Sequence, residues 1–264
     1  MTAGARVLGG SVLLTLASLA PIRSQPVDAG SWTARGDSLM AALDTEAASE
    51  AYRRGLSVRS DDPEILWKLA RAISNRTAET PGREGDRPLH EEAVELARRA
   101  VAAGPQVART HTTLATALGR YGRWLAHECR IRCAGQVVDM GKEAYRATRR
   151  AIEIDPYDPA PFVVLGVYHR DLSTAPLVVK ILAKAFLGGY PPVSLGQSAA
   201  YLERATRLDP GDVTAHLELA RTYREMGRRG EARAETAAAL GAPVRERLDV
   251  VEKEEARALL DALD

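Results

Sequence analysis

The 264-residue sequence has little of several features that would point to a particular chemistry. It contains two cysteines, two phenylalanines, three tryptophans and a single asparagine. Its formal net charge is only +1, so it lacks the basic excess typical of proteins that bind the phosphate backbone of nucleic acids. No segment alternates apolar and polar residues over the length of a strand. We therefore expect an all-α chain that does not bind nucleic acid.

Catalytic signatures are missing as well. The sequence contains no G-x-S-x-G elbow, no H-E-x-x-H motif, no phosphate-cradling glycine loop and no Rossmann fingerprint. Its five histidines are scattered, and we expect His111, His169 and His216 to pack within helices rather than to bind a metal. We predict that the protein is not an enzyme and uses no metal or cofactor. A catalytic role remains as a remote alternative, and the segment 119–142 is where it would lie.

What the sequence does have is one spacing that occurs four times. A Leu followed by Ala or Gly stands nine residues after a turn residue, and small residues stand five and twelve residues before that turn residue. Small residues at fixed intervals allow two helices to pack closely, and the recurring turn leads to the next pair. The spacing thus predicts a helical repeat array. The four sets are Ala48, Gly55, Ser60 and Leu69; Ala93, Ala100, Pro105 and Leu114; Ala144, Ala151, Pro156 and Leu165; and Ser198, Ala205, Pro210 and Leu219.

The repeat resembles the tetratricopeptide pattern, most clearly over residues 217–240, which read LELARTYREMGRRGEARAETAAAL with a turn at Gly227. Repeats of that family are helical hairpins of about 34 residues, and Ser198 to Ala232 spans 34 positions. The resemblance implies an all-α, right-handed superhelical stack of hairpins. We expect residues 25–264 to form one domain, with these elements: hairpins at about 32–60, 64–105, 109–156, 160–210 and 214–241, and a capping helix at 244–263.

Three repeats are longer than the family norm. From the Leu of the first helix to the small residue of the second, the last repeat takes 13 residues and the three before it take 24, 30 and 33. All the extra length therefore falls inside repeats, along one edge of the stack, which is either a binding face or a site that tolerates insertion. We expect a polar loop at 74–90 and an amphipathic helix at 177–187.

The second insertion holds both cysteines, Cys129 and Cys133, close to His127. In an exported chain, two cysteines suggest a disulfide. In a regular helix, however, the Cβ atoms of such residues are about 5–6 Å apart, whereas a disulfide requires about 3.5–4.5 Å. A disulfide would need a bent or broken helix near 130–132. Two free thiols, or a metal site for which no fourth ligand is evident, are the alternatives.

The first 24 residues read as a secretory signal peptide. Arg6 precedes an apolar run at 7–20, and a polar stretch ends at Ser24. We expect cleavage near Ser24 and a mature chain in the periplasm or outside the cell, with no membrane span. The alternative is an uncleaved signal that anchors the chain in the membrane.

The C-terminal half resembles the regulator of microtubule dynamics family and its bacterial relatives. The resemblance rests on VVKILAKAFLGGYPPVSLGQSAAYLERATRLDP at 178–210 and HLELARTYREMG at 216–227. It implies a repeat fold and a binding role, and it supplies no catalytic residues. Microtubule binding does not follow from it, because an exported chain would not meet microtubules.

In repeats of this type the first helices line a concave groove. Guanidinium groups around an apolar centre suit an acidic or carboxylate-bearing peptide, although an ordinary solvated helix face would carry similar residues. We therefore predict a scaffold that binds a protein or peptide in the cell envelope. The alternative is a structural subunit or homo-oligomer of an envelope complex. The candidate groove residues are Trp67, Arg71, Arg170, Arg221 and Arg224.

Overall fold

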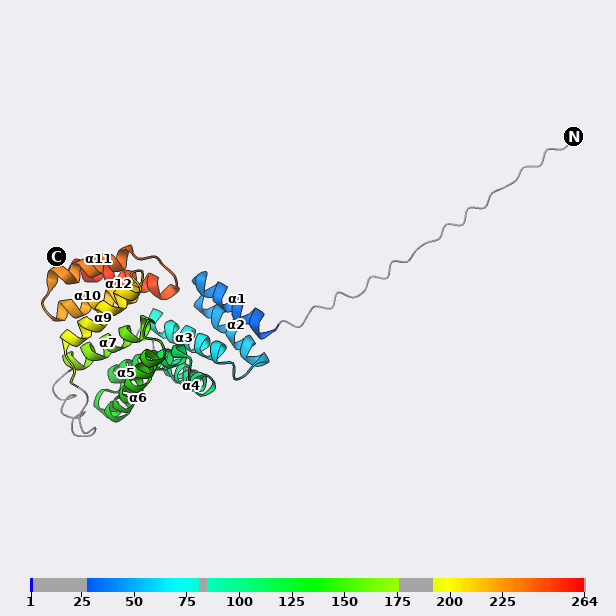
Figure 1. Cartoon of the computed structure of the whole chain (residues 1–264), viewed down its shortest axis with the longest axis horizontal. Coiled ribbons are helices and arrows are strands. Elements are labelled where there is room, and N and C mark those ends of the chain that lie inside the picture. Colours follow the sequence, from blue (N-terminus) through cyan, green and yellow to red (C-terminus); the bar gives the residue numbers. More distant parts are fainter. Residues whose placement is uncertain (2–27, 81–84, 176–191, 264) are drawn as a thin grey trace.

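The computed structural model describes residues 28–80, 85–175 and 192–263, together with Met1. Within these ranges the secondary structure is helical and contains no strand, and consecutive helices pack as antiparallel pairs (Figure 1). The pairs stack on one another into the expected superhelical array. The elements are α1 (Ala29–Ala41), α2 (Thr45–Val58), α3 (Pro63–Glu79), α4 (Arg87–Ala103), α5 (Ala108–Glu128), the short 3-10 helix η1 (Arg130–Cys133), α6 (Ala134–Ile154), α7 (Ala160–Thr174), α9 (Leu195–Leu208), α10 (Val213–Glu225), α11 (Arg229–Gly241) and α12 (Arg247–Leu263).

Short turns with a capping aspartate lead from one hairpin to the next. Asp62 Oδ1 accepts hydrogen bonds from the backbone N–H groups of Glu64 and Ile65, and Asp212 Oδ1 accepts one from Ala215. These carboxylates satisfy amide groups that have no partner inside the helix. In the turns after Ser60 and Pro210, an aspartate two residues on therefore starts the next helix.

The small residues of the repeat mark places where helices touch. A Cβ on Gly166 of α7 would overlap Leu202 Cγ of α9, so no larger residue fits. Ser198 Oγ donates to the Gly166 carbonyl at 2.7 Å, which ties the two helices together at the same point. Gly227 has φ of 75° in the turn between α10 and α11, a conformation that favours glycine.

Two histidines close equivalent turns. A ring nitrogen of His111 lies 3.0 Å from the Pro105 carbonyl oxygen, and one of His216 lies 3.1 Å from that of Pro210. His216 also contacts a carboxylate oxygen of Glu235 at 2.6 Å, which raises its pKa. Both rings thus have a structural role in helix packing, as the sequence predicts.

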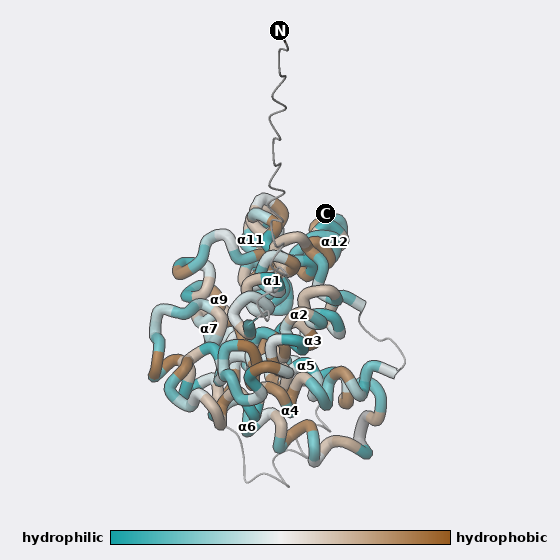
Figure 2. The backbone as a smooth tube through the Cα atoms, turned by 90° about the vertical axis from the view of Figure 1, so that its right-hand side faces the viewer, coloured by the Kyte–Doolittle hydropathy of each residue, from teal (hydrophilic) through white to brown (hydrophobic). Residues whose placement is uncertain are grey.

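The buried apolar side chains form two large cores and a small one. The first core is built from α1 to α6, and the second from α9 to α12. The small one lies between them and contains Phe162 of α7, Ala205 of α9 and Ala215 of α10. Apolar and hydrophilic residues alternate along the helices (Figure 2), as expected where each helix buries one face.

The first two insertions lengthen helices more than they add loops. The helices α5 and α6 have 21 residues each, against 13 each in α10 and α11. The expected polar loop at 74–90 is wrong at both ends, because α3 continues to Glu79 and α4 begins at Arg87. Ser74 and Asn75 are polar but buried, with 2% and 4% of their surfaces exposed. They lie against α5, where both accept a hydrogen bond from Arg120. The helix predicted at 177–187 lies outside the described residues.

The predicted signal peptide also lies outside the described residues, apart from Met1. Among the residues that are described, none of the helices has both the length and the apolar character needed to span a bilayer.

Candidate functional site: the inner ring

From the second hairpin onward, the first helices of the hairpins contact one another in sequence, and α12 completes the series by contacting α3. The contacts join α3 to α5, α5 to α7, α7 to α10 and α10 to α12, and α12 in turn contacts α3. The inner faces of these five helices therefore form a closed ring instead of the open groove that the repeat pattern predicts. We call this set of faces the inner ring.

The inner ring contains a buried carboxylate between two arginines. Glu218 of α10 is 5% exposed and accepts hydrogen bonds from Arg170 of α7 and from Arg221, the latter at 2.8 Å. Burial opposes ionisation of Glu218, but the two guanidinium groups outweigh it and lower its pKa to about 2. Arg221 also donates to Glu255 of α12 at 2.6 Å. Charged pairs thus hold α7, α10 and α12 together.

On the other side of the ring a guanidinium group has only neutral partners. Arg120 of α5 donates to Asn75 Oδ1 at 2.7 Å and to Ser74 Oγ at 3.3 Å, both on α3. Within the described part of the chain, no carboxylate lies within ion-pairing distance of Arg120. Burial, followed by the charge of Arg123, lowers the pKa of Arg120. The positive charge of this arginine is therefore poorly compensated.

The helix α12 supplies the acidic groups that face these arginines. Glu252 is 8% exposed and accepts a hydrogen bond from Thr214 Oγ1 at 2.6 Å. Burial raises the pKa of Glu252 to about 8, although Thr214 and Arg120 both act in the opposite direction. Glu246, just before α12, lies 3.8 Å from Arg71 of α3. Asp249 fixes the start of the helix by accepting from the Arg245 and Glu246 amides at 2.6 and 2.9 Å.

The five predicted groove residues lie in three different surroundings. Arg170 and Arg221 meet at Glu218, whereas Trp67 and Arg71 lie together on α3, with the guanidinium carbon 5.8 Å from the ring centroid. Arg224 is 48% exposed and pairs with its neighbour Glu225 at 3.1 Å. The sequence treats all four arginines as free groups along an open groove. That view of Arg170 and Arg221 is wrong, because acids of α10 and α12 already neutralise them.

Sequence reasoning missed the acidic side of the ring. Glu218 stands between Leu217 and Leu219 in an apolar stretch, and a single acid in such a place is a signal for a buried ion pair. Asn75 is the only asparagine of the chain, but the amino-acid sequence does not indicate that Arg120 lies beside it. Glu252 could not be found, because its burial depends on how far the stack curves.

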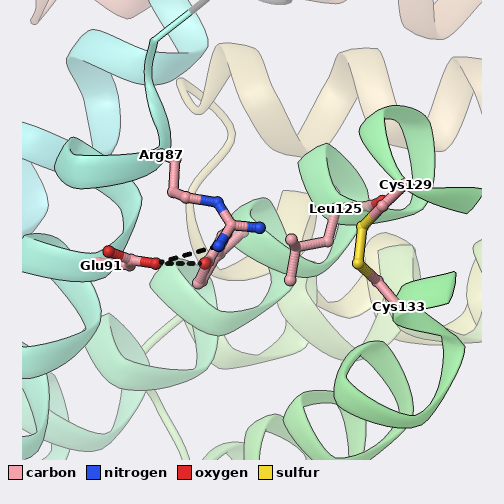
Figure 3. Close-up of a disulfide and its surroundings, with 6 residues drawn as sticks. Arg87, Glu91, Leu125, Cys129 and Cys133 are labelled. Carbon is pink, nitrogen blue, oxygen red and sulfur yellow. Dashed lines mark hydrogen bonds and ion pairs between the residues drawn. A yellow bond between two sulfur atoms is a disulfide. The ribbon is translucent and has the colours of Figure 1, made fainter.

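The second insertion contains a disulfide between Cys129 and Cys133 (Figure 3). The helix α5 ends at Glu128 and η1 follows at once, so the helix breaks where the sequence requires it for a disulfide. The two Cα atoms are 5.6 Å apart, within the usual range. The bond leaves no thiolate from these residues for a metal. On the adjoining turns, His90 stacks on Tyr121 with their ring centroids 5.4 Å apart.

A hollow of about 580 Å³ lies on the outer side of the stack, between α4, α5 and α6. Its floor is apolar and its rim is mostly acidic, with one ion pair across it between Arg98 and Glu143 at 2.7 Å. The residues that line it are Glu91, Val94, Glu95, Arg98, Tyr121, Gln136, Asp139, Met140 and Glu143.

A comparison with known proteins gives the family. The family model described as Regulator of microtubule dynamics protein 1-3 matches residues 32–264. The chain belongs to the regulator of microtubule dynamics family. Regulator of microtubule dynamics protein 1 of Bos taurus is 28% identical over 167 residues, which cover 62% of this chain and 50% of the bovine protein. The corresponding protein of Mus musculus is 25% identical over 210 residues, 77% of this chain and 65% of the mouse protein.

The chain thus matches about half the length of its bovine relative. Among solved structures, a tetratricopeptide-repeat protein from Thermus thermophilus aligns with a TM-score of 0.61 at 23% identity, covering 88% of this chain and 98% of that one. At this level of identity the likeness establishes the fold alone. This member of the regulator of microtubule dynamics family is a tetratricopeptide-type helical repeat protein, of the architecture used by binding scaffolds.

Proposed function

We propose that this protein is a non-catalytic scaffold that binds a protein or peptide partner through its inner ring, and that it does so after export to the cell envelope. The observation that carries the proposal is the composition of the inner ring. Its contacts between hairpins run through Arg170, Glu218, Arg221 and Glu255, where a stack built only for stability would bury apolar side chains. These buried pairs make the inner ring polar, and its part-exposed groups, such as Arg71, suit recognition of a polar chain segment.

The test is affinity capture of the tagged, full-length protein from its own cell envelope, followed by mass spectrometry. Arg71→Glu reverses the charge of an inner-ring residue that is 41% exposed, so it should lower recovery of a true partner at least about tenfold. Arg207→Glu on α9 is the matched control, since Arg207 is 68% exposed and lies outside the ring. Equal recovery with both variants would refute the inner ring as the binding site.

Export is tested separately by the intact mass of the native protein. Cleavage of the signal peptide should leave a chain that begins at or near Gln25. A product that retains residues 1–24 in a membrane fraction would support the anchored alternative, and one in the cytosol would refute export.

The alternative function is a structural subunit of an envelope assembly. The 21-residue helices α5 and α6 favour this alternative. They are longer than the neighbouring helices α4 and α7, so their ends extend beyond the stack and offer a surface to another subunit. Light scattering after gel filtration distinguishes the two functions: a stable oligomer in the absence of any partner would favour assembly.

A further inference from the structure

The contact that closes the inner ring is weaker than the buried Arg170–Glu218 contact between α7 and α10. Arg71 and Glu246 are 3.8 Å apart, and their side chains are 41% and 22% exposed, so solvent screens much of the attraction. The rest of α12 is held on α10 and α11 by the buried side chains of Ala256, Leu259 and Leu263. If the contact with α3 opens, α12 therefore remains on its own side of the ring.

The α3 side of this contact has hydrogen-bond donors that the closed ring does not satisfy. Arg71 Nε and Asn75 Nδ2 are buried and have no acceptor among the described residues. Arg120 donates to Asn75 Oδ1, which fixes the orientation of the amide and makes Nδ2 the unused donor. Buried donors without acceptors disfavour the state in which they are buried.

The charges at the contact are also unmatched. Arg120 faces Glu246 and Glu252 of the α12 side, which attract it without forming an ion pair. Arg71, Asn75 and Arg120 together offer two guanidinium groups and an amide, the donors that bind a carboxylate well. The acids that approach them are Glu246, whose carboxylate lies 3.8 Å from Arg71, and Glu252, whose pKa is raised to about 8 by burial, so neither fully compensates the two guanidinium groups.

We propose that the contact between α12 and α3 is a latch over a carboxylate receptor formed by Arg71, Asn75 and Arg120, and that an acidic segment of a protein partner fills this receptor when the latch opens. The inference rests on the proposed function and deepens it, because it names the chemistry of the partner and the place where it enters. The receptor is tested with a peptide of known sequence, so its failure leaves binding of a partner elsewhere on the ring open to the capture experiment above.

The experiment measures binding of fluorescein-labelled hexaglutamate to the full chain by fluorescence anisotropy, with labelled hexaglutamine as the control peptide. Glu246→Gln weakens the latch and should therefore lower the dissociation constant of hexaglutamate about fivefold or more. Fivefold is the lower end of the change in affinity that is usual when a conformational change is coupled to ligand binding. Glu225→Gln on α10 removes the same charge away from the latch and should leave the affinity unchanged.

Asn75→Asp tests the receptor with a side chain of the same size, because it places a carboxylate where the peptide carboxylate would bind. The new carboxylate would lie beside Arg120 and supply the missing counter-charge, so the fold should be retained, as circular dichroism can show. In the Glu246→Gln background this change should weaken hexaglutamate binding about tenfold or more, and Arg71→Gln should weaken it too. Gln106→Glu adds the same charge on an exposed turn and should have little effect.

The proposal is overturned if Glu246→Gln binds hexaglutamate no more tightly than the unaltered chain does. It is also overturned if Asn75→Asp and Arg71→Gln both leave the affinity unchanged, or if hexaglutamine binds as well as hexaglutamate does.

Discussion

Two joints connect the N-terminal core (α1 to α6) with the C-terminal core (α9 to α12), and they are built differently. At α7 the chain is continuous, Phe162 is 2% exposed within the small core, and the Arg170–Glu218 pair is buried. At the latch the chain is discontinuous, and the ion pair between Arg71 and Glu246 is part-exposed. The proposed latch is therefore the more weakly held of these two joints.

The difference has a physical origin. Apolar burial and a desolvated, fully paired charge are both costly to undo, whereas a screened ion pair contributes little. Local unfolding and domain motion begin where buried contacts are few. We expect motion between the two cores to pivot at α7 and to open at the latch.

The largest expected effect is at the continuous joint. Phe162→Ala removes a buried ring that packs beneath Arg204, whose guanidinium carbon lies 4.2 Å from the ring centroid. It should lower the free energy of unfolding by about 4 kcal/mol, the usual cost of such a truncation, as measured by denaturant unfolding. Tyr157→Ala at the preceding turn, where the side chain is 77% exposed, should cost less than about 0.5 kcal/mol. Similar losses for the two variants would contradict the assignment of the joint to α7.

The charged part of the same joint should matter nearly as much. Glu218→Ala leaves Arg170 buried without its main partner, and we expect a loss of about 3 kcal/mol. Because the pKa of Glu218 is lowered to about 2 from its ordinary value of 4.5, its stabilisation is present above pH 4.5 and is lost as the pH falls towards 2. The alanine variant should therefore lose less stability between about pH 4.5 and about pH 2.5 than the unaltered protein. Glu225→Ala is the control on the same helix.

Between the two joints lies Glu252, and its effect has the opposite dependence on pH. Its pKa is raised to about 8 by burial, so the folded state holds a proton that the unfolded state releases above about pH 4.5. Stability should fall as the pH rises from about 4.5 to about 8. The groups that face it are Thr214, Asp212 and Glu218 of α10 and Arg120 of α5.

Glu252→Gln keeps a neutral side chain at every pH. The difference in unfolding free energy between this variant and the unaltered protein should change by about 3.5 kcal/mol between about pH 5 and about pH 8, in favour of the variant at the higher pH. Taking the difference cancels groups that titrate in both proteins, His216 among them. A difference that stays constant over this range would show that Glu252 ionises freely and that the ring is open to water there.

The smallest effect is expected at the latch. A double-mutant cycle with Arg71→Gln and Glu246→Gln should give a coupling energy below about 1 kcal/mol, as for other part-exposed pairs. A coupling above about 3 kcal/mol, comparable with the joint at α7, would remove the difference between the two joints and the latch with it.

Most of the fold could be predicted from the sequence because each repeat is specified locally. The Leu–Ala pairs, the turn prolines and the small residues such as Gly166 act between helices that are near neighbours in the chain. The closure of the ring could not be predicted in this way, because contact between α12 and α3 depends on the accumulated curvature of the hairpins between them. The repeat positions of Arg170 and Arg221 place both residues on the inner face. The position of Glu252 opposite them depends on ring closure and could not be predicted.

The cysteines lie between these cases. Their spacing defines the condition for a disulfide, namely a break in the helix, but whether the helix breaks depends on how the hairpin turns. The structure meets that condition at η1.

The unequal length of the hairpins has a mechanical consequence. With 21 residues in each helix and a rise of about 1.5 Å per residue, α5 and α6 extend about 12 Å farther than the 13-residue helices of the last hairpin. The disulfide closes the turn at the far end, where Trp124 and Leu125 pack in the N-terminal core, so this end of the pair moves with that core. A small rotation of the N-terminal core about α7 therefore becomes a larger displacement at the far end of α5 and α6. If one label of a distance-measuring pair is placed at the far end of α5 and the other on α11, the distance between them should change strongly with the angle between the two cores.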